Sequence, residues 1–314
     1  MMKVVFIDQV HEVLEQRLKV SGFEVIDASR SSREECKPLV ADAGGIVIRS
    51  RFPMDEDFLK HAPELLFIAR SGAGMENIDT EYTEKRGIVC FNAPEGNRNA
   101  VAEHALGMLL ALFNHLHTAD QEVRSGLWRR EENRGEELAG KTVGIIGYGN
   151  NGSAFAKVLR GFNTKVLAFD KYKKGFGDEW VHEVSLETLQ KEADIISFHI
   201  PQTEETTFWF NKTFVEAVRK PFFLINLSRG KIVSTKALVE GLKSGKIRGA
   251  CLDVLEYEKS SFENAFNEQN TPALEYLLKS TNVILSPHVG GWTKESYFKL
   301  SNVLADKILN FNFE

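Results

Sequence analysis

Residues Thr142–Asp170 read TVGIIGYGNNGSAFAKVLRGFNTKVLAFD. Near the start of this stretch, an apolar run leads into Gly147, Gly149 and Gly152, which have the G-x-G-x-x-G spacing of a dinucleotide-binding turn. A helical stretch follows the glycines, and a second β-rich run ends just before Asp170. The succession of strand, glycine turn, helix, strand and acidic residue predicts a βαβ unit that binds a dinucleotide.

The glycine spacing has a physical basis at each position. Gly147 allows the tight turn off the strand, Gly149 lets the backbone approach a pyrophosphate, and Gly152 lets the helix pack closely on the strand. The unpaired N–H groups at the start of the helix then face the phosphates. Glycines alone also mark ordinary turns, so the interpretation depends on the surrounding elements.

Asp170 predicts which dinucleotide binds. At the end of the second strand, a carboxylate accepts hydrogen bonds from the ribose hydroxyls of the adenosine and repels a 2′-phosphate. This favours NAD over NADP. Lys171, Lys173 and Lys174 follow directly and leave NADP as the alternative, because lysine side chains bind phosphate.

The length and composition bound the remaining possibilities. A chain of 314 residues exceeds one typical core and predicts two domains. The net charge of −5 and the dispersed lysines and arginines argue against a nucleic-acid partner. The N-terminal stretch MMKVVFID is too short for a signal peptide, and no apolar run reaches the length of about 18 residues typical of a membrane helix. We therefore expect a cytoplasmic protein without a membrane partner.

Cysteine and histidine spacing predicts neither disulfides nor a metal site. Cys36, Cys90 and Cys251 are odd in number, far apart and without C-x-x-C spacing, so we interpret them as small apolar residues. The sequence has no H-x-x-x-H pattern or Cys/His cluster, and it has no G-x-S-x-G motif of acyl transfer.

The first ninety residues alternate between strand-like and helical runs. Arg49 and the stretch Arg70–Gly74 follow two of the strands, at the edge where open parallel sheets bind ligands. This alternation predicts a small flavodoxin-like domain. The expected strands are Lys3–Asp8, Phe23–Ile26, Gly45–Arg49, Leu66–Ala69 and Ile88–Phe91, and the expected helices are Val10–Val20, Arg33–Ala41, Asp55–His61 and Thr80–Lys85.

Helical periodicity then predicts one long helix over Asn99–Arg124, after a break marked by Pro94 and Gly96. We expect this helix to connect the two domains and to bury part of its apolar face against another subunit. Its three histidines, His104, His115 and His117, are interpreted as packed or solvated side chains rather than catalytic ones.

Strands and helices alternate again after the glycine turn, which predicts a doubly wound sheet. The segment Glu256–Thr281 lacks a clear period and is either a loop with a short helix or a surface insertion, and Thr293–Leu309 is an amphipathic helix expected to return to the first domain. The expected strands are Asp194–Ile200, Phe222–Leu227, Gly249–Val254 and Asn282–Ser286, and the helices are Leu186–Glu192, Lys212–Val218 and Thr235–Lys243.

Arg229, Glu258 and His288 follow strands of this second sheet and are therefore expected at its carboxyl edge. Arg229 can hold a substrate carboxylate through two parallel hydrogen bonds. His288 can exchange a proton with a hydroxyl group, and Glu258 can orient the imidazole and favour its charged form. Each residue taken alone also has an ordinary structural explanation. Their shared position predicts hydride transfer at an oxygen-bearing carbon next to a carboxylate.

The chain resembles the D-isomer-specific 2-hydroxyacid dehydrogenases, and within them it is most similar to D-3-phosphoglycerate dehydrogenases. The resemblance extends over almost the whole chain. It rests on motifs in the family's order: ARSGAGMENID, NAPEGNRNAVAEHALGMLLAL, GLWRREENRGEELAGKTVGIIGYGNNG, FHIPQTEETTF, NLSRGKIV, ALVEGLKSGKIRGACLDVLEYE and SPHVGGWT.

The resemblance implies a Rossmann NAD-binding domain over 98–289, a flavodoxin-like substrate domain built from 1–97 and 290–314, and homodimers formed through the nucleotide domain. It implies that Arg229, Glu258 and His288 are catalytic. The implied cofactor residues are Gly147, Gly149, Asn150, Asn151, Gly152, Asp170, His199, Pro201, Thr203, Thr206, Asn226, Ser228 and Asp253. The implied substrate residues are Arg49, Ser71, Gly72, Ala73, Gly74, Asn77, Arg130 and Trp292.

The sequence departs from the family pattern near the proposed site. Lys259 stands where the family usually has proline, Leu255 where phenylalanine is common, and Trp292 where a small residue often follows the glycine. The first two changes can alter how Glu258 is held, and Trp292 can narrow a cleft or pack at a hinge. The chain also ends at Glu314, which predicts a short form without the family's regulatory domain.

The resemblance favours 3-phosphoglycerate and 3-phosphohydroxypyruvate as the substrate pair, and hence a role in serine biosynthesis. Arg49 and Arg130 are the candidate phosphate ligands, and Arg134 is a weaker one. Reduction of glyoxylate, hydroxypyruvate or another ketoacid is the alternative. Formate oxidation is disfavoured, because the formate-oxidising members pair the histidine with glutamine. An NADH-sensing corepressor scaffold is the alternative from another class.

Overall fold

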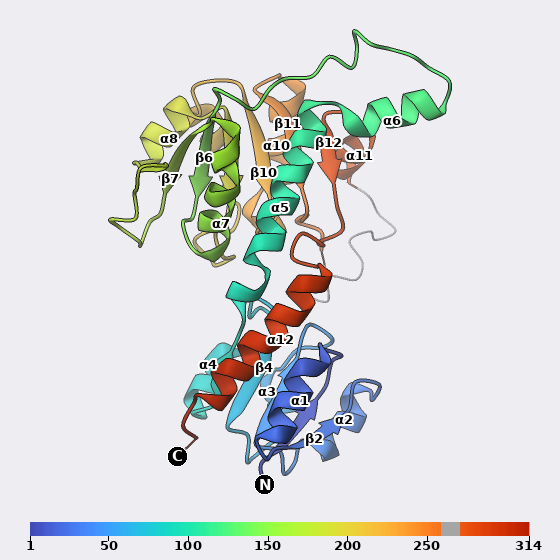
Figure 1. Cartoon of the computed structure of the whole chain (residues 1–314), viewed down its shortest axis with the longest axis vertical. Coiled ribbons are helices and arrows are strands. Elements are labelled where there is room, and N and C mark those ends of the chain that lie inside the picture. The colour runs from blue at the N-terminus through green and yellow to red at the C-terminus, as the bar shows by residue number, and fades with distance from the viewer. Residues whose placement is uncertain (259–270, 314) are drawn as a thin grey trace. The chain divides into compact units, whose positions relative to one another are not determined.

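The computed structural model describes residues 1–258 and 271–313 (Figure 1). These residues divide into two compact units. The first holds Met1–Arg98 and 292–313, and the second holds Asn99–Glu258 and 271–291. Each unit has its own parallel sheet and its own core.

The first unit contains a five-stranded parallel sheet in the order β2-β1-β3-β4-β5, which is the flavodoxin-like order. The strands are β1 (Lys3–Phe6), β2 (Glu24–Asp27), β3 (Gly45–Ile48), β4 (Phe67–Arg70) and β5 (Val89–Phe91). The helices are α1 (Glu12–Val20), α2 (Arg33–Leu39), α3 (Glu56–Leu59), α4 (Thr80–Lys85) and α12 (Lys294–Leu309).

The two faces of this sheet have separate cores, because successive side chains of a strand point to opposite faces. On one face Val5 and Ile46 pack with Phe58 of α3. On the other face Val4 packs with Leu14 of α1, and the buried side chains of α12 complete this core. Those α12 side chains are Leu300, Leu304, Ala305 and Ile308.

The second unit contains a seven-stranded parallel sheet in the order β12-β11-β10-β9-β6-β7-β8. Its strands are β6 (Thr142–Ile146), β7 (Lys165–Phe169), β8 (Val181–Glu183), β9 (Ile195–Phe198), β10 (Phe222–Asn226), β11 (Ile247–Leu252) and β12 (Val283–Leu285). Its helices are α6 (Leu116–Arg124), α7 (Asn150–Leu159), α8 (Leu186–Glu192), α9 (Lys212–Ala217), α10 (Thr235–Lys243) and α11 (Pro272–Lys279), with most of α5 (Pro94–Phe113).

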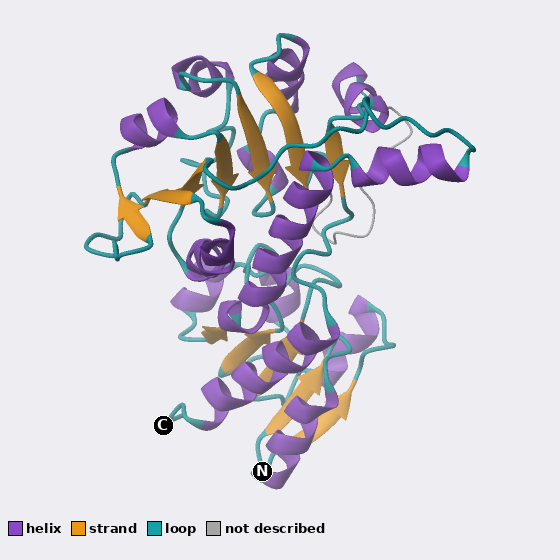
Figure 2. Ribbon diagram, turned by 45° about the horizontal axis from the view of Figure 1, so that its top comes forward, coloured by secondary structure: helices purple, strands orange, loops and turns teal. Residues whose placement is uncertain are grey.

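Helices cover both faces of this sheet (Figure 2). Buried residues of α5 and α7 pack on one face, and those of α8, α9, α10 and α11 pack on the other. The order of the strands reverses between β6 and β9, and such a reversal opens a crevice at the carboxyl ends of the strands. The predicted fold class, a Rossmann sheet with a second doubly wound sheet, is confirmed.

The single helix predicted over Asn99–Arg124 is wrong. The chain forms α5 and α6 instead, and His115 between them adopts a left-handed backbone with φ of 51°. The predicted break at Pro94 and Gly96 is also wrong, since α5 begins at Pro94. Gly96 serves close packing, because a Cβ there would lie 2.7 Å from the backbone nitrogen of Leu300 in α12.

Several smaller expectations can be compared with the described residues. Helix α11 lies within the segment for which a short helix was one alternative, whereas Lys259 and the rest of 259–270 lie outside the described residues. Strand β8 was not predicted. Cys36 and Cys251 are buried thiols whose pKa values are raised by that burial, which confirms them as small core residues.

Two absences concern the described residues alone. Within 1–258 and 271–313, no helix has the length and apolar character needed to cross a membrane. The same part of the chain brings no three His, Cys, Asp or Glu side chains together in a metal-binding group.

Candidate active site

The glycine turn connects β6 to α7 at the point where the strand order reverses. Gly147 has φ of 91°, and a Cβ at Gly152 would lie 2.0 Å from the carbonyl oxygen of Gly147, so the turn closes only with glycine at both positions. Gly149 caps α7 without a side-chain hydrogen bond and faces open space. The first N–H groups of α7, at Asn150 and Asn151, are thus placed as a dinucleotide phosphate requires.

Asp170 follows β7 and is held by backbone amides. Its Oδ2 accepts a hydrogen bond from Tyr148 N at 2.8 Å, and its Oδ1 accepts from Tyr172 N and Lys173 N, each at 2.9 Å. Burial opposes ionisation, but these N–H donors and the nearby Lys173 outweigh it, so the pKa of Asp170 is lowered. The side chain is therefore a fixed carboxylate at the position where the sequence predicts a ribose ligand.

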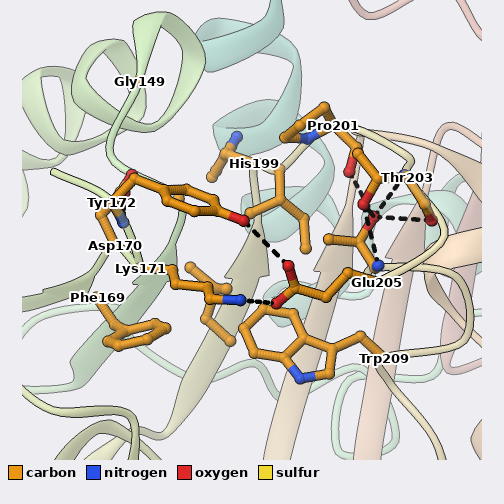
Figure 3. Close-up of a pocket in the computed structure, with 14 residues that line it drawn as sticks. Gly149, Phe169, Asp170, Lys171, Tyr172, His199, Pro201, Thr203, Glu205 and Trp209 are labelled. Atoms are coloured by element: carbon orange, nitrogen blue, oxygen red, sulfur yellow. Dashed lines mark hydrogen bonds and ion pairs between the residues drawn. The ribbon is translucent and has the colours of Figure 1, made fainter.

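A pocket joins the glycine turn to Asp170 and to the loop that follows β9 (Figure 3). Of the residues implied by resemblance, it is lined by Gly147, Gly149, Asp170, His199, Pro201, Thr203 and Thr206. Lys171, which the sequence analysis named as a possible phosphate ligand, also lines it. The sequence analysis missed the other lining residues, which are Ile146, Phe169, Tyr172, Ile200, Glu205 and Trp209. Only their proximity to Asp170 and to the threonine-rich loop could have indicated them.

The loop after β9 is internally braced. Thr206 Oγ1 donates to the carbonyl oxygen of Pro201 at 2.7 Å, and it accepts from Thr203 N at 2.7 Å. His199 lies beside Ser197, with 2.8 Å between Nε2 and Oγ. Burial lowers the pKa of His199 to about 4, so its ring is neutral near neutral pH.

Arg229 lies in a loop that Asn226 holds in place. Asn226 is fully buried at the end of β10, where its Nδ2 donates to Arg229 O at 3.0 Å. Its Oδ1 accepts from both Ser228 N at 3.1 Å and Ser228 Oγ at 2.7 Å. The structure thus gives Asn226 and Ser228, which the resemblance assigns to the cofactor, a part in orienting Arg229.

His288 and Glu258 form a close pair. His288 Nδ1 lies 2.6 Å from Glu258 Oε2, and the two side chains are 22% and 15% exposed. The other carboxylate oxygen, Oε1, accepts a hydrogen bond from Leu255 N. The backbone of His288 is left-handed, with φ of 55°, and its N–H donates to Asp253 O at 2.8 Å. The pairing predicted for Glu258 and His288 is present in the structure.

Asp253 anchors the loop that carries His288. Its side chain is almost fully buried and accepts from Ser286 Oγ at 2.6 Å, Val289 N at 2.9 Å and Gly290 N at 2.8 Å. His104 of α5 lies 2.9 Å from Ser286 Oγ. The resemblance assigns Asp253 to the cofactor, whereas in the structure its carboxylate binds residues of the loop at 286–290. His104 and Ser286 complete this network, which the sequence analysis missed.

In the first unit, the stretch Ser71–Gly74 follows β4, and Asn92 Nδ2 donates to the carbonyl oxygen of Ala73 at 2.7 Å. At Gly72 a Cβ would overlap the Arg70 guanidinium. Ser71 Oγ and both polar side-chain atoms of Asn77 are buried without a partner in the described part of the chain. Buried polar groups normally have partners, so this loop retains hydrogen-bonding capacity for a polar ligand.

Arg49 and Trp292 form a stacked pair in the same unit. The Arg49 guanidinium carbon lies 4.0 Å from the centroid of the indole ring, and burial lowers the Arg49 pKa. Within residues 1–258 and 271–313 the guanidinium has no hydrogen bond or ion pair, although Asp8 binds the Arg49 backbone. Stacking on one face leaves the in-plane N–H groups available to an anion.

The two other candidate phosphate ligands are in the second unit, in the segment after α6. Arg130 is exposed and has no polar contact with another described residue. Arg134 pairs with Glu131 at 2.5 Å, and both side chains are mostly exposed. In the part of the chain that the structure describes, neither residue therefore has a ligand-binding environment.

Residues 106–290 match the family model for the NAD-binding domain of D-isomer-specific 2-hydroxyacid dehydrogenases. Over 98% of its length, the chain is 35% identical to D-3-phosphoglycerate dehydrogenase of Archaeoglobus fulgidus, and it spans 57% of that protein. It is 33% identical to glyoxylate reductase of Pyrococcus furiosus, covering 95% of this chain and 88% of the relative.

The chain is also similar to a solved structure of a dehydrogenase. D-lactate dehydrogenase from Aquifex aeolicus, complexed with NAD and lactic acid, superposes with a TM-score of 0.81 at 28% sequence identity. The superposition covers 98% of this chain and 94% of that one. The likeness therefore extends over both units of the chain.

Proposed function

This chain belongs to the D-isomer-specific 2-hydroxyacid dehydrogenases, as its motifs predict, and from this we propose that it interconverts a D-2-hydroxyacid and its 2-ketoacid with NAD. The observation that carries the proposal is the 2.6 Å contact between His288 Nδ1 and Glu258 Oε2. A histidine held in this way by a carboxylate is suited to move the proton that accompanies hydride transfer.

The second unit fits the cofactor. The open space at Gly149 and the free N–H groups of α7 suit the pyrophosphate, and the fixed carboxylate of Asp170 suits the ribose hydroxyls. Bound NADH would supply the hydride that reduces the carbonyl carbon of the ketoacid. The residues of the chain then bind the acid, orient it and exchange its proton.

His288 exchanges the proton through Nε2, because Nδ1 faces Glu258. In ketoacid reduction the imidazolium donates a proton to the oxygen that gains charge, and in hydroxyacid oxidation the neutral ring accepts it. Glu258 stabilises the imidazolium in both directions. Leu255 N keeps the carboxylate in place.

Arg229 binds the substrate carboxylate and polarises the adjacent carbonyl. Its planar guanidinium can form two parallel hydrogen bonds with a carboxylate, which fixes the acid in one orientation. The hydrogen bonds of Asn226 to Ser228 and to the Arg229 backbone hold the loop in the conformation that this contact needs. In the first unit, Ser71 and Asn77 have buried polar atoms without a partner among the described residues, which supports the assignment of that loop to substrate binding.

We infer that the acid carries a second anionic group, with 3-phosphoglycerate and 3-phosphohydroxypyruvate as the favoured pair and serine biosynthesis as the setting. The half-buried Arg49 guanidinium, stacked on Trp292 and without an ion pair among the described residues, supports an anionic substrate. Glyoxylate or hydroxypyruvate is the second candidate, because the chain is also 33% identical to a glyoxylate reductase. Neither of these acids requires a phosphate site.

Assembly as a homodimer accompanies this proposal. Helix α6 and the segment after it expose large apolar side chains, with Leu116 56%, Val123 52% and Trp128 78% accessible. Such a patch is typical of a protein interface. Arg130 follows this patch directly, so a partner subunit would give it the environment that the single chain lacks.

A panel of ketoacids tests the function. Purified protein is mixed with NADH and with phosphohydroxypyruvate, hydroxypyruvate or glyoxylate, and oxidation of NADH is followed by absorbance. We expect the highest kcat/KM with phosphohydroxypyruvate. An equal or higher kcat/KM with hydroxypyruvate or glyoxylate, which lack a phosphate group, would refute the phosphate assignment. If NADH binds but no ketoacid is turned over, the corepressor-like scaffold replaces the enzyme.

A further inference from the structure

The pocket beside Asp170 contains a second carboxylate, Glu205, to which the resemblance assigns no role. Glu205, in the loop after β9, reaches the turn after β7 (Figure 3). Its Oε1 pairs with Lys171 Nζ, and its Oε2 accepts a hydrogen bond from Tyr172 OH at 3.0 Å. The pair of Lys171 and Glu205 is about half exposed, so solvent and ligand reach both groups.

The three lysines after Asp170 differ in what holds them. Lys173 Nζ lies 5.3 Å from the centroid of the Tyr148 ring, and Lys174 Nζ donates to Asp170 O at 3.1 Å. Among the three, Lys171 is the one that the described residues pair with a carboxylate. The lysine next to the ribose-binding Asp170 is therefore neutralised by Glu205.

We propose that Glu205 is a second cofactor-specificity residue, which excludes NADP by neutralising Lys171 and by adding a carboxylate beside Asp170. This inference rests on the proposed use of NAD. A 2′-phosphate carries about −1.5 to −2 charges at neutral pH. It would meet Asp170 and Glu205 together, while the ammonium that could bind it is already engaged. NAD has a ribose hydroxyl at this position and is unaffected.

The strength of exposed charge contacts sets the expected change in NADPH affinity. One exposed charge contact changes affinity by up to about fivefold. Replacing Glu205 with Gln removes one repulsion and releases Lys171, so the two contributions act in the same direction. We expect the dissociation constant of NADPH to fall roughly fivefold or more, and that of NADH to change less than about twofold. The gain should shrink as salt is added, because salt screens exposed charges.

Calorimetric titration tests the inference without relying on turnover. NADH and NADPH are titrated into the wild type, Glu205→Gln, and the double variant Glu205→Gln/Lys171→Gln. Glu204→Gln is the matched control, because Glu204 is the adjacent exposed glutamate and has no bond to Lys171. We expect tighter NADPH binding in Glu205→Gln, and a smaller gain in the double variant, where the released ammonium is gone and only the loss of repulsion remains.

Three results would overturn the inference: unchanged NADPH binding in Glu205→Gln, an equal gain in Glu204→Gln, or an equal gain in the double variant. A wild type that binds NADPH as tightly as NADH would overturn it as well. Failure of the proposed function looks different, because the protein would then bind NADH with the expected specificity and reduce no ketoacid.

Discussion

Replacing Glu258 with Gln should disable His288 in both directions of the reaction. In the wild type, one carboxylate oxygen accepts from Leu255 N and the other faces His288 Nδ1 at 2.6 Å. A glutamine has one acceptor and one donor end. Leu255 N–H can pair only with the amide oxygen, so the amide NH₂ group turns toward Nδ1.

With a donor in place of an acceptor beside Nδ1, the imidazole ring of His288 is held in a protonation state that suits neither direction of the reaction. Because the NH₂ group donates, Nδ1 must be unprotonated, and the single proton of the neutral ring moves to Nε2. The imidazolium needed for ketoacid reduction loses its acceptor. The neutral ring can no longer accept a proton at Nε2 during hydroxyacid oxidation. Both rates should therefore fall, rather than one at the expense of the other.

The magnitude follows from the contact that is lost. A hydrogen bond to a charged partner contributes about 1.5–3 kcal/mol, and both side chains are buried enough to keep most of it. This corresponds to a loss of roughly 10- to 150-fold in kcat/KM. Steady-state rates of ketoacid reduction and hydroxyacid oxidation measure it, and NADH affinity should remain unchanged.

Glu275→Gln is the control, since Glu275 is an exposed glutamate of α11 in the same unit. It should leave both rates within about twofold of the wild type. If Glu258→Gln retains rates within threefold in both directions, the pair does not set the protonation of His288, and the proton passes through another group.

Three further predictions concern other parts of the structure. Arg229→Gln removes the charge and the paired donors, so it should lower kcat/KM by about a hundredfold or more with little change in NADH affinity, while near-normal turnover would make Arg229 a turn residue. Arg49→Gln should raise KM for phosphohydroxypyruvate much more than for hydroxypyruvate, and equal effects would remove the phosphate assignment. His199 resists protonation in the folded state, since its pKa is about 4 against an ordinary 6.5, so its contribution to stability is complete above pH 6.5 and is lost as the pH falls toward 4. Urea unfolding between pH 7.5 and 4.5 should show a loss of up to about 3 kcal/mol that His199→Gln reduces, and an identical slope in both proteins would contradict this.

Much of the fold follows from local pattern. Every strand except β8 could be predicted, because buried parallel strands are short apolar runs and the helices between them have clear apolar faces. Strand β8 has only three residues, of which Val181 alone is buried, so it lacks such a run. The failure at His115 has a specific cause. Apolar residues continue at helical spacing through that point, and only the left-handed backbone of one histidine ends α5. A periodic pattern does not reveal such a single dihedral angle.

The candidate site divides in the same way. The glycine turn, Asp170 and the pairing of Glu258 with His288 could be predicted, because each follows a strand and all such residues share one sheet edge. The contacts of Asp253 and Glu205 could not. Each joins loops that are far apart in the chain, Asp253 to the 286–290 loop and Glu205 to Lys171, and which neighbour a carboxylate meets depends on tertiary geometry.

The position of α12 in the chain has a consequence during synthesis on the ribosome. Its side chains complete the core around Val4 and Leu14, yet it is translated after the whole of the second unit. Helix α1 covers part of this face early, but the rest of the face must stay uncovered while nearly two hundred further residues are added. A protein in this state is a natural client for chaperones. Ribosome-bound chains arrested before residue 294 should bind a chaperone more strongly than those arrested beyond α12.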